Sequence, residues 1–229
     1  MSVVALLPMK AHSERVSGKN FCPLAGKPLF RWILHSLLSI DEIDKVIINT
    51  DARDLLAENG LTGSDRVVIR DRKPDLCGDF VSMNLILEDD LHATDADHYI
   101  MTHTTNPLLS SETIRRALGN YLSGVRTDEC DSLFGVTKYQ TRFYKENGDA
   151  INHDPNNLIR TQDLEPWYEE NSCLYIYSKA SFEKTSARIG ERPRLFEIPK
   201  LQAIDIDEKE DWFLASSVVK SLIAGEIDV

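Results

Sequence analysis

The sequence has few of the features that mark secreted, metal-stabilised or membrane proteins. Its four cysteines are dispersed, so they offer neither metal-ligand spacing nor a disulfide framework, and we expect reduced thiols. No apolar run approaches the ~18 residues of a transmembrane helix. The apolar stretch at 2–8 is too short for a signal peptide and has no basic leader before it. We therefore expect a cytoplasmic protein with no membrane partner.

The common nucleotide-binding motifs are also missing. No G-x-G-x-x-G follows the first apolar run, so a classical dinucleotide-binding fold is unsupported. The Gly-Lys pairs at 18–19 and 26–27 lack the spacer and the Ser or Thr of a Walker phosphate loop. His12 and Ser13 offer a weak hydrolase alternative, because residues adjacent in sequence seldom face each other in a catalytic arrangement.

Basic residues are outnumbered, 26 against 37 acidic ones, and the formal net charge is -11. This balance disfavours nucleic acid as a partner. The first 35 residues differ, because they contain one acid, Glu14, and five basic residues: Lys10, Arg15, Lys19, Lys27 and Arg31. Their net charge of +4 leaves -15 for the remainder. A local positive site on an acidic body predicts a small, highly charged anionic ligand.

Apolar runs alternate with amphipathic stretches through the first half of the chain. The pattern predicts strands at 3–9, 45–51, 66–71 and 97–105, and helices at 28–39, 52–60, 79–93 and 110–124. Because these strands are apolar on both faces, we expect an α/β fold with a mostly parallel sheet wrapped by helices.

The second half departs from this alternation. Residues 138–171 are polar and contain the hairpin signal Asn147-Gly148, so we expect an excursion from a single domain that spans residues 1–229. Further strands are expected at 172–178, 194–199 and 203–207, before a last helix at 210–225.

Ligands of open parallel sheets bind outside the carboxyl ends of the strands. Three polar segments follow predicted strands there, namely 10–20, Thr50-Asp51 and 102–107. The first contains Lys10, Ser13, Arg15, Lys19 and Asn20. Such cations and donors suit a triphosphate, whose oxygens gain charge as pyrophosphate leaves. The alternative is an ordinary solvated basic surface.

Two aspartates near the carboxyl terminus form a second candidate site. In a strand, Asp205 and Asp207 share one face, roughly 7 Å apart. Two carboxylates on one face suit Mg²⁺. Alternatively, Asp207 and Glu210 form a capping box for the last helix, and spacing alone leaves both interpretations open. Arg70, Arg72 and Lys73 form a third candidate site. They line a base or ribose pocket in one interpretation and are ordinary surface charges in the other.

Six segments in the same order resemble the motifs of the acylneuraminate cytidylyltransferases, which make CMP-activated sialic and related sugar acids. They are "LPMKAHSERVSGKN", "NTD", "RKPDLCGD", "HTTNPLL", "ENSCLYI" and "AIDIDEKED". The resemblance runs over nearly the whole chain. It implies a Rossmann-like nucleotide-diphospho-sugar transferase fold with a small protruding dimerisation element, which residues 138–171 fit. The implied reaction transfers CMP from CTP to the anomeric hydroxyl of a 2-keto-3-deoxy sugar acid and releases pyrophosphate.

The resemblance also assigns expected roles. The implied catalytic residues are Lys10, Arg15, Lys19 and Asp207. The implied nucleotide-binding residues are Lys10, Ser13, Arg15, Lys19, Asn20, Arg72 and Ser82. The implied acceptor-binding residues are His103, Thr105, Asn171 and Tyr175, with Arg160 of the partner subunit reaching the substrate carboxylate. Asp205 and Asp207 are implied ligands of Mg²⁺, so the resemblance favours metal binding over helix capping.

Several positions depart from the family pattern. The chain has Lys10 for arginine, Glu14 for lysine with Arg15 next to it, Ser17 for proline, His103 for glutamine, Leu109 for arginine and Ser172 for glycine. The changes cluster on the sugar side, so they leave the acceptor open more than the nucleotide. Alternatives are an eight-carbon sugar acid, a phosphonate acceptor, or a silent homologue that binds nucleotide without turnover.

Overall fold

A computed structural model describes residues 1–13 and 15–227 of the chain. Glu14, which replaces the lysine of the family motif, lies outside the described residues. The main sheet contains β1 (Val3–Leu6), β4 (Lys45–Thr50), β5 (Val67–Asp71), β6 (His98–Thr102), β7 (Ser132–Tyr139), β8 (Trp167–Ser178) and β9 (Pro193–Glu197). Its order is β5-β4-β1-β6-β8-β7-β9, and β8 runs antiparallel to both of its neighbours. All other neighbouring strands pair in parallel, so the sheet is mostly parallel, as the sequence predicted.

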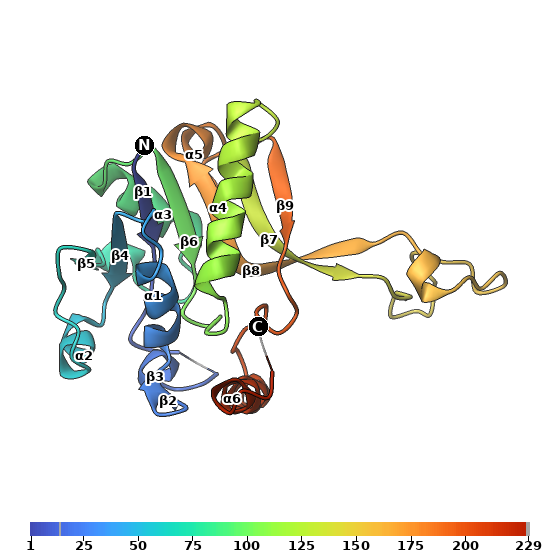
Figure 1. Cartoon of the computed structure of the whole chain (residues 1–229), viewed down its shortest axis with the longest axis horizontal. Coiled ribbons are helices and arrows are strands. Elements are labelled where there is room, and N and C mark those ends of the chain that lie inside the picture. Colours follow the sequence, from blue (N-terminus) through green and yellow to red (C-terminus); the bar gives the residue numbers. More distant parts are fainter. Residues whose placement is uncertain (14, 228–229) are drawn as a thin grey trace.

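Helices cover both faces of this sheet (Figure 1). In β1, Val3 and Ala5 join a core with α1 (Phe30–Leu38) and α4 (Ser111–Arg126). Val4 and Leu6 point the other way, toward α3 (Met83–Ala93) and α5 (Lys179–Thr185). The apolar character of both strand faces therefore has a direct structural cause.

The remaining elements are short or lie at one end of the sheet. The helix α2 (Arg53–Glu58) follows β4, and β2 (Pro23–Leu24) and β3 (Lys27–Pro28) form a small antiparallel ladder. The 3-10 turns are η1 (Lys19–Phe21), η2 (Pro74–Leu76) and η3 (Thr161–Asp163). The last helix, α6 (Lys209–Ile223), packs on Leu24, Leu29 and Leu108 near the carboxyl ends of the parallel strands.

Helix capping corrects one predicted helix boundary and one predicted capping pair. Ser82 caps α3 by accepting a hydrogen bond from the Asn84 amide at 3.3 Å, so the helix begins four residues later than the predicted 79. The capping box of α6 joins Glu208 and Asp211, not Asp207 and Glu210. The helix-cap interpretation of Asp207 is therefore wrong. Ala203 ends a turn and residues 204–207 form no strand, which also corrects the expected strand at 203–207.

The hairpin of β7 and β8 continues well beyond the body of the molecule (Figure 1). At its far end lies a segment, residues 140–166, that contains η3 and the turn around Gly148, where φ is +87°. The sequence predicted an excursion here, but it missed β7 and started β8 five residues too late, at 172. Large apolar side chains are exposed along this hairpin: Tyr144, Ile151, Leu158, Ile159, Trp167 and Tyr168.

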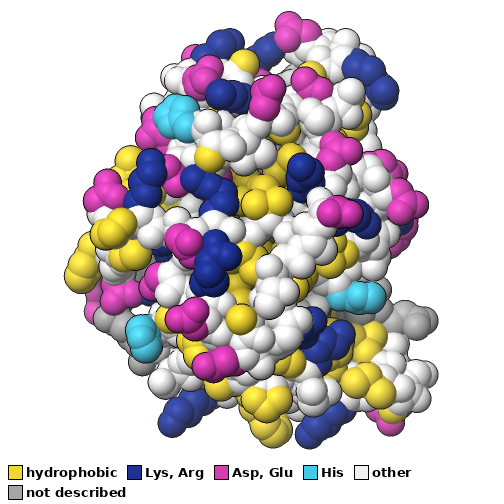
Figure 2. Space-filling model, turned by 90° about the vertical axis from the view of Figure 1, so that its left-hand side faces the viewer, with side chains coloured by type: hydrophobic (Ala, Val, Ile, Leu, Met, Phe, Trp, Pro, Cys, Tyr) yellow, Lys and Arg dark blue, Asp and Glu magenta, His cyan; other side chains and the backbone are white. Residues whose placement is uncertain are grey.

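The helices and the surface charge bear on the expected lack of membrane and nucleic-acid partners. Among the described helices, none has both the length and the apolar character needed to cross a membrane. Figure 2 shows the face of the molecule seen from the left of Figure 1, where basic and acidic side chains are interspersed with hydrophobic surface. This face therefore lacks the broad basic surface typical of proteins that bind polyanions.

Candidate functional site

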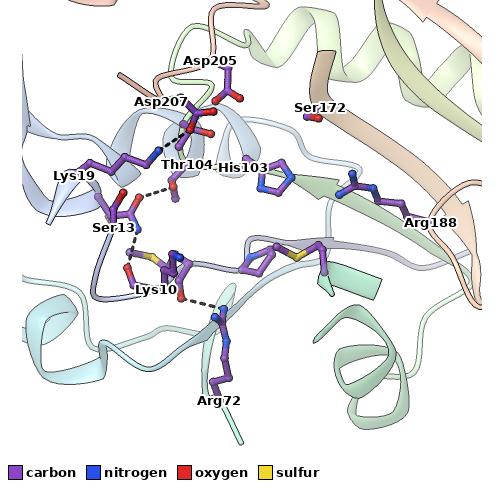
Figure 3. A pocket seen from close by; sticks show the side chains of 15 residues that line it. Lys10, Ser13, Lys19, Arg72, His103, Thr104, Ser172, Arg188, Asp205 and Asp207 are labelled. Atoms are coloured by element: carbon purple, nitrogen blue, oxygen red, sulfur yellow. Dashed lines mark hydrogen bonds and ion pairs between the residues drawn. The ribbon is translucent and has the colours of Figure 1, made fainter. Parts of the chain in front are cut away.

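A cavity of about 410 Å³ opens at the carboxyl ends of the parallel strands (Figure 3). Its walls come from segments that are far apart in the sequence: the connection after β1, the turn after β6, the residue after β5 and the connection before α6. The predicted site residues that line it are Lys10, Ser13, Lys19, Asn20, Arg72, His103, Thr105, Asp205 and Asp207. The topology therefore brings the loop at 10–20 and both aspartates to one cavity.

Asn20 fixes the loop at 10–20 against the strand ends. Its side chain is buried, donates to the backbone oxygen of Lys10 at 2.8 Å and accepts from the Thr104 hydroxyl at 2.6 Å. Gly18, with φ at +61°, starts the 3-10 turn that contains Lys19 and Asn20, a conformation that favours glycine. Asn20 thus ties the loop to the segment that follows β1 and to the turn after β6 by hydrogen bonds.

Opposite charges meet at one end of the cavity. The Lys19 ammonium donates to Asp207 Oδ1 at 3.1 Å and to the backbone oxygen of Ile206 at 2.7 Å. Arg15 lies beside the cavity and pairs with Asp207 Oδ2 at 3.0 Å. Lys10 pairs with Asp79, from the segment before α3. The three basic residues expected to hold phosphate are therefore each paired with a carboxylate.

Arg72 is held differently, by neutral groups. Its guanidinium donates to Asn49 Oδ1 at 3.0 Å and to the backbone oxygens of Asn49 and Met9 at 2.9 and 3.1 Å. Burial lowers the pKa of Arg72 from its ordinary value. Because a guanidinium stays protonated at neutral pH, a half-buried positive charge faces the cavity without a hydrogen-bonded carboxylate among the described residues.

A buried charge network supports Arg72 from behind. The Asn49 amide donates to Asp90 Oδ1 at 2.8 Å, and Arg70 donates to Asp90 and to Asp89. Burial raises the pKa of Asp90 to about 6 despite these donors. Arg70, expected from the sequence near a base or ribose pocket, therefore serves this network and does not line the cavity.

His103 lies at the centre of the cavity (Figure 3). Burial lowers its pKa to about 4, with the positive charges of Arg188 and Lys19 acting in the same direction. The imidazole is therefore neutral at pH 7, and it offers one donor and one acceptor to a ligand.

The described residues contain no group of three or more His, Cys, Asp or Glu side chains placed to hold a metal. Two carboxylates nevertheless suit Mg²⁺, which completes its shell with water and phosphate oxygens. Asp205 Oδ1 is buried and has no hydrogen-bond partner, and burial raises the pKa of this carboxyl. Asp207 lines the same cavity and its side chain is 39% exposed. An unpartnered buried oxygen beside an accessible carboxylate fits a divalent cation.

Other predicted residues lie outside the cavity lining. Ser82 is the cap of α3, and Asn171 is buried, where its amide donates to the Thr137 hydroxyl at 3.2 Å. Tyr175 is buried, and its phenol hydroxyl donates a hydrogen bond to Glu170 Oε1. Arg160 lies on the hairpin segment, is 73% exposed and pairs with Asp163 at 2.7 Å. Within one chain, none of these four side chains lines the cavity.

The cavity also contains residues that the sequence analysis missed: Pro8, Met9, Met83, Thr104, Ser172 and Arg188. Arg188 is the notable omission, because it brings a further cation to the side of the cavity opposite Lys19 (Figure 3). It stands in the connection between α5 and β9, and a charged residue in a connection usually faces solvent. The neighbouring family motifs "HTTNPLL" and "ENSCLYI" carried the only signals for Thr104 and Ser172.

Comparisons with known proteins agree with this architecture. A family model described as "Cytidylyltransferase" matches residues 4–213. An N-acylneuraminate cytidylyltransferase of Streptococcus agalactiae serotype III is 26% identical over 221 residues, which cover 93% of this chain and 52% of that protein. The chain thus spans about half the length of the curated relatives it matches first. A pseudaminic acid cytidylyltransferase of Campylobacter jejuni is 22% identical, and the match covers 96% of this chain and 97% of that protein.

A solved structure supports the fold. A CMP:2-keto-3-deoxy-manno-octonic acid synthetase complexed with CTP superposes with a TM-score of 0.64 at 17% identity, covering 99% of this chain and 100% of that one. The likeness at this identity concerns the fold, and it agrees with the nucleotide-diphospho-sugar transferase architecture expected from the sequence.

Proposed function

This chain belongs to the cytidylyltransferase family, and from that membership we propose that it transfers CMP from CTP to the anomeric hydroxyl of a 2-keto-3-deoxy sugar acid. The observation that carries the proposal is the convergence of Lys10, Lys19 and the two aspartates, from opposite ends of the chain, on one cavity at the carboxyl ends of the strands. The relatives named above act on sialic and pseudaminic acids, which supports a sugar acid as the acceptor class.

The transfer is a single displacement at phosphorus. The acceptor oxygen attacks the α-phosphorus of CTP, and the bond from that phosphorus to the oxygen bridging to the β-phosphorus breaks. The hydroxyl proton passes to solvent, and pyrophosphate leaves. Lys10, Arg15 and Lys19 have the charge to stabilise this leaving group. Because each now pairs with a carboxylate, the triphosphate replaces or shares those partners when it binds.

Arg72, Ser13 and Asn20 complete the nucleotide side in this proposal. Arg72 offers a fixed charge held by neutral groups, and Asn20 keeps the loop in place. Asp205 and Asp207 would hold Mg²⁺, for the reasons of donor type and burial given above. When bound there, the metal neutralises phosphate charge and favours ionisation of the attacking hydroxyl.

The acceptor is assigned to the side of the cavity that contains His103 and Thr105. Neutral His103 suits hydrogen bonding to sugar hydroxyls better than binding an anion. Asn171 and Tyr175 act indirectly here, since both are buried behind the wall. We assign Arg160 to the acceptor site of a second subunit, because the hairpin extends it far from the cavity of its own chain.

The test is an acceptor panel. The protein is incubated with Mg²⁺, CTP and, separately, sialic, legionaminic, pseudaminic and eight-carbon sugar acids, and pyrophosphate release is followed. Release with one acid identifies the reaction and the acceptor together. CTP binding without release across the panel would contradict sugar-acid transfer and favour a different acceptor or a silent nucleotide-binding protein.

A further inference from the structure

Arg188 is an immobilised cation in the cavity. It comes from the connection between α5 and β9, and its side chain is 20% exposed. Its guanidinium carbon lies 3.8 Å from the centroid of the Tyr175 ring, and Nη1 lies 4.0 Å from the Met101 sulfur. Stacking on a buried aromatic ring fixes the plane of the guanidinium.

The carboxylate nearest to Arg188 is already shared. Glu170 Oε1 lies 3.5 Å from Arg188 Nη2, a long contact, and accepts the phenol hydrogen of Tyr175. Within the described residues, the guanidinium makes hydrogen bonds to this oxygen and to the Met101 sulfur. A guanidinium has five N–H donors, so most of its hydrogen-bonding capacity is left for a ligand.

The exposed end of Arg188 points into the cavity toward His103, from the side opposite Lys19 and the two aspartates (Figure 3). Lys10, Lys19 and Arg72 already provide positive charge on the nucleotide side. A separate cation on the other side therefore matches a second negative group, one that belongs to the acceptor. Met83 and Ser172 also line the cavity and offer an apolar contact and a hydroxyl for the rest of that molecule.

We infer that Arg188 binds the carboxylate of the acceptor from within the same chain and thereby selects acids over neutral sugars. The planar guanidinium matches the two oxygens of a carboxylate. This assignment rests on the proposed function. It adds a cation from the same chain to Arg160, which is 73% exposed on the hairpin and is expected to reach the same carboxylate from a second subunit. Arg188 sets acceptor affinity, while binding of CTP does not depend on it.

The test compares an accepted sugar acid with its primary amide, which has the same shape but no charge. We expect wild-type protein to prefer the acid by about 10- to 100-fold in kcat/KM. In Arg188→Gln this ratio falls several-fold, because the acid loses its partner from the same chain and the amide loses little, while the KM for CTP is unchanged. Arg116→Gln, on the exposed face of α4, keeps the wild-type ratio.

Arg188→Lys separates charge from geometry. It keeps the charge but loses the planar fork and the stacking, so the KM for the acid rises several-fold and the acid is still preferred. It also carries the test if Arg188→Gln does not fold. An unchanged acid-to-amide ratio in Arg188→Gln, or an unchanged KM for the acid in Arg188→Lys, would overturn this inference and leave the proposed function standing. No pyrophosphate release by the wild-type protein with any sugar acid would overturn the proposed function and the inference with it.

Discussion

Lys19 and Asp207, 188 residues apart in the sequence, form an ion pair at 3.1 Å beside the cavity. Lys19 belongs to the loop after β1, and Asp207 belongs to the connection before α6. The Ile206 amide of that connection donates to the Thr105 oxygen, in the turn after β6, at 2.8 Å. The pair therefore joins the amino-terminal loop to the segment before α6. It also places a cation for phosphate next to a candidate metal ligand.

Replacement of Asp207 tests that arrangement. If Asp207 holds Mg²⁺ as proposed, we expect Asp207→Ala to lower pyrophosphate release more than about 100-fold, because a ligand of that metal is lost. The melting temperature should change little, since the pairs of this half-exposed carboxylate contribute at most about 1 kcal/mol. Glu183→Ala, an exposed acid on α5, is the control and keeps full activity. Turnover near the wild-type rate would contradict the metal assignment.

Asn20 provides a test of the loop. Asn20→Ala leaves the Thr104 hydroxyl and the Lys10 oxygen without their partner, so we expect a loss of about 1–3 kcal/mol in the free energy of unfolding. CTP should also bind more weakly, because Lys10 and Lys19 are no longer held in place. Urea denaturation and calorimetric CTP titration measure the two effects. Asn157→Ala, exposed on the hairpin, is the matched control, and a variant as stable as this control would contradict the role of Asn20.

The parallel sheet and its covering helices were predictable because their signals are local. Two-sided apolar strands and amphipathic helices are visible in any short window, as Val3 to Leu6 and Phe30 to Leu38 illustrate. The helix caps were less predictable. Ser82 and Glu208 each stand near other residues able to cap, and tertiary contacts decide which residue does so.

Asp205 and Asp207 were predicted to lie together, but the reason for that prediction was wrong. They were expected to share the face of a strand, but residues 203–207 form no strand. They line the same cavity because hydrogen bonds fix this segment on both sides: the Ile206 amide donates to the Thr105 oxygen, and Lys19 donates to the Ile206 oxygen. No signal in the sequence marked Arg188, because its contacts depend on tertiary structure. The antiparallel pairing of β8 with β6 sets Tyr175 beside Met101, and Arg188 contacts both.

Asp90 gives a prediction for pH. Burial raises its pKa in the folded chain to about 6, above the ordinary value of 3.8, so between these values the folded state holds a proton that the unfolded state lacks. The free energy of unfolding therefore decreases as the pH rises through this range, and the stabilisation is lost above pH 6. From pH 5 to 7.5 we expect wild-type protein to lose about 1 kcal/mol relative to Asp90→Asn.

Urea denaturation of both proteins at the two pH values measures this difference. Asp41→Asn, an exposed residue outside the network, should show the wild-type pH dependence. Parallel curves for wild-type protein and Asp90→Asn would show that Asp90 is not protonated in this range. Because Asn49 links Asp90 to Arg72, the affinity for CTP in Asp90→Asn should also fall, which calorimetry at pH 7.5 measures.

The protruding hairpin gives a prediction about assembly. Its exposed apolar side chains, Ile151, Leu158, Ile159 and Trp167 among them, form a surface that a second copy of the chain would bury. Replacing residues 140–166 by Asn-Gly closes the β7–β8 ladder at the Tyr139–Trp167 pair with a two-residue turn. We expect the wild-type chain to sediment as a dimer and this variant as a monomer with its sheet intact.

Arg160→Gln separates assembly from catalysis within that hairpin. It removes one exposed side chain that pairs with Asp163 and leaves the apolar surface in place, so the variant should remain a dimer. If Arg160 acts in the neighbouring subunit, the KM for the acceptor rises and the KM for CTP does not. A wild-type chain that sediments as a monomer at all concentrations would contradict the dimer, because Arg160 then has no second cavity to enter. An Arg160→Gln dimer with an unchanged KM for the acceptor would limit the hairpin to assembly and leave Arg188 as the cation on the acceptor side.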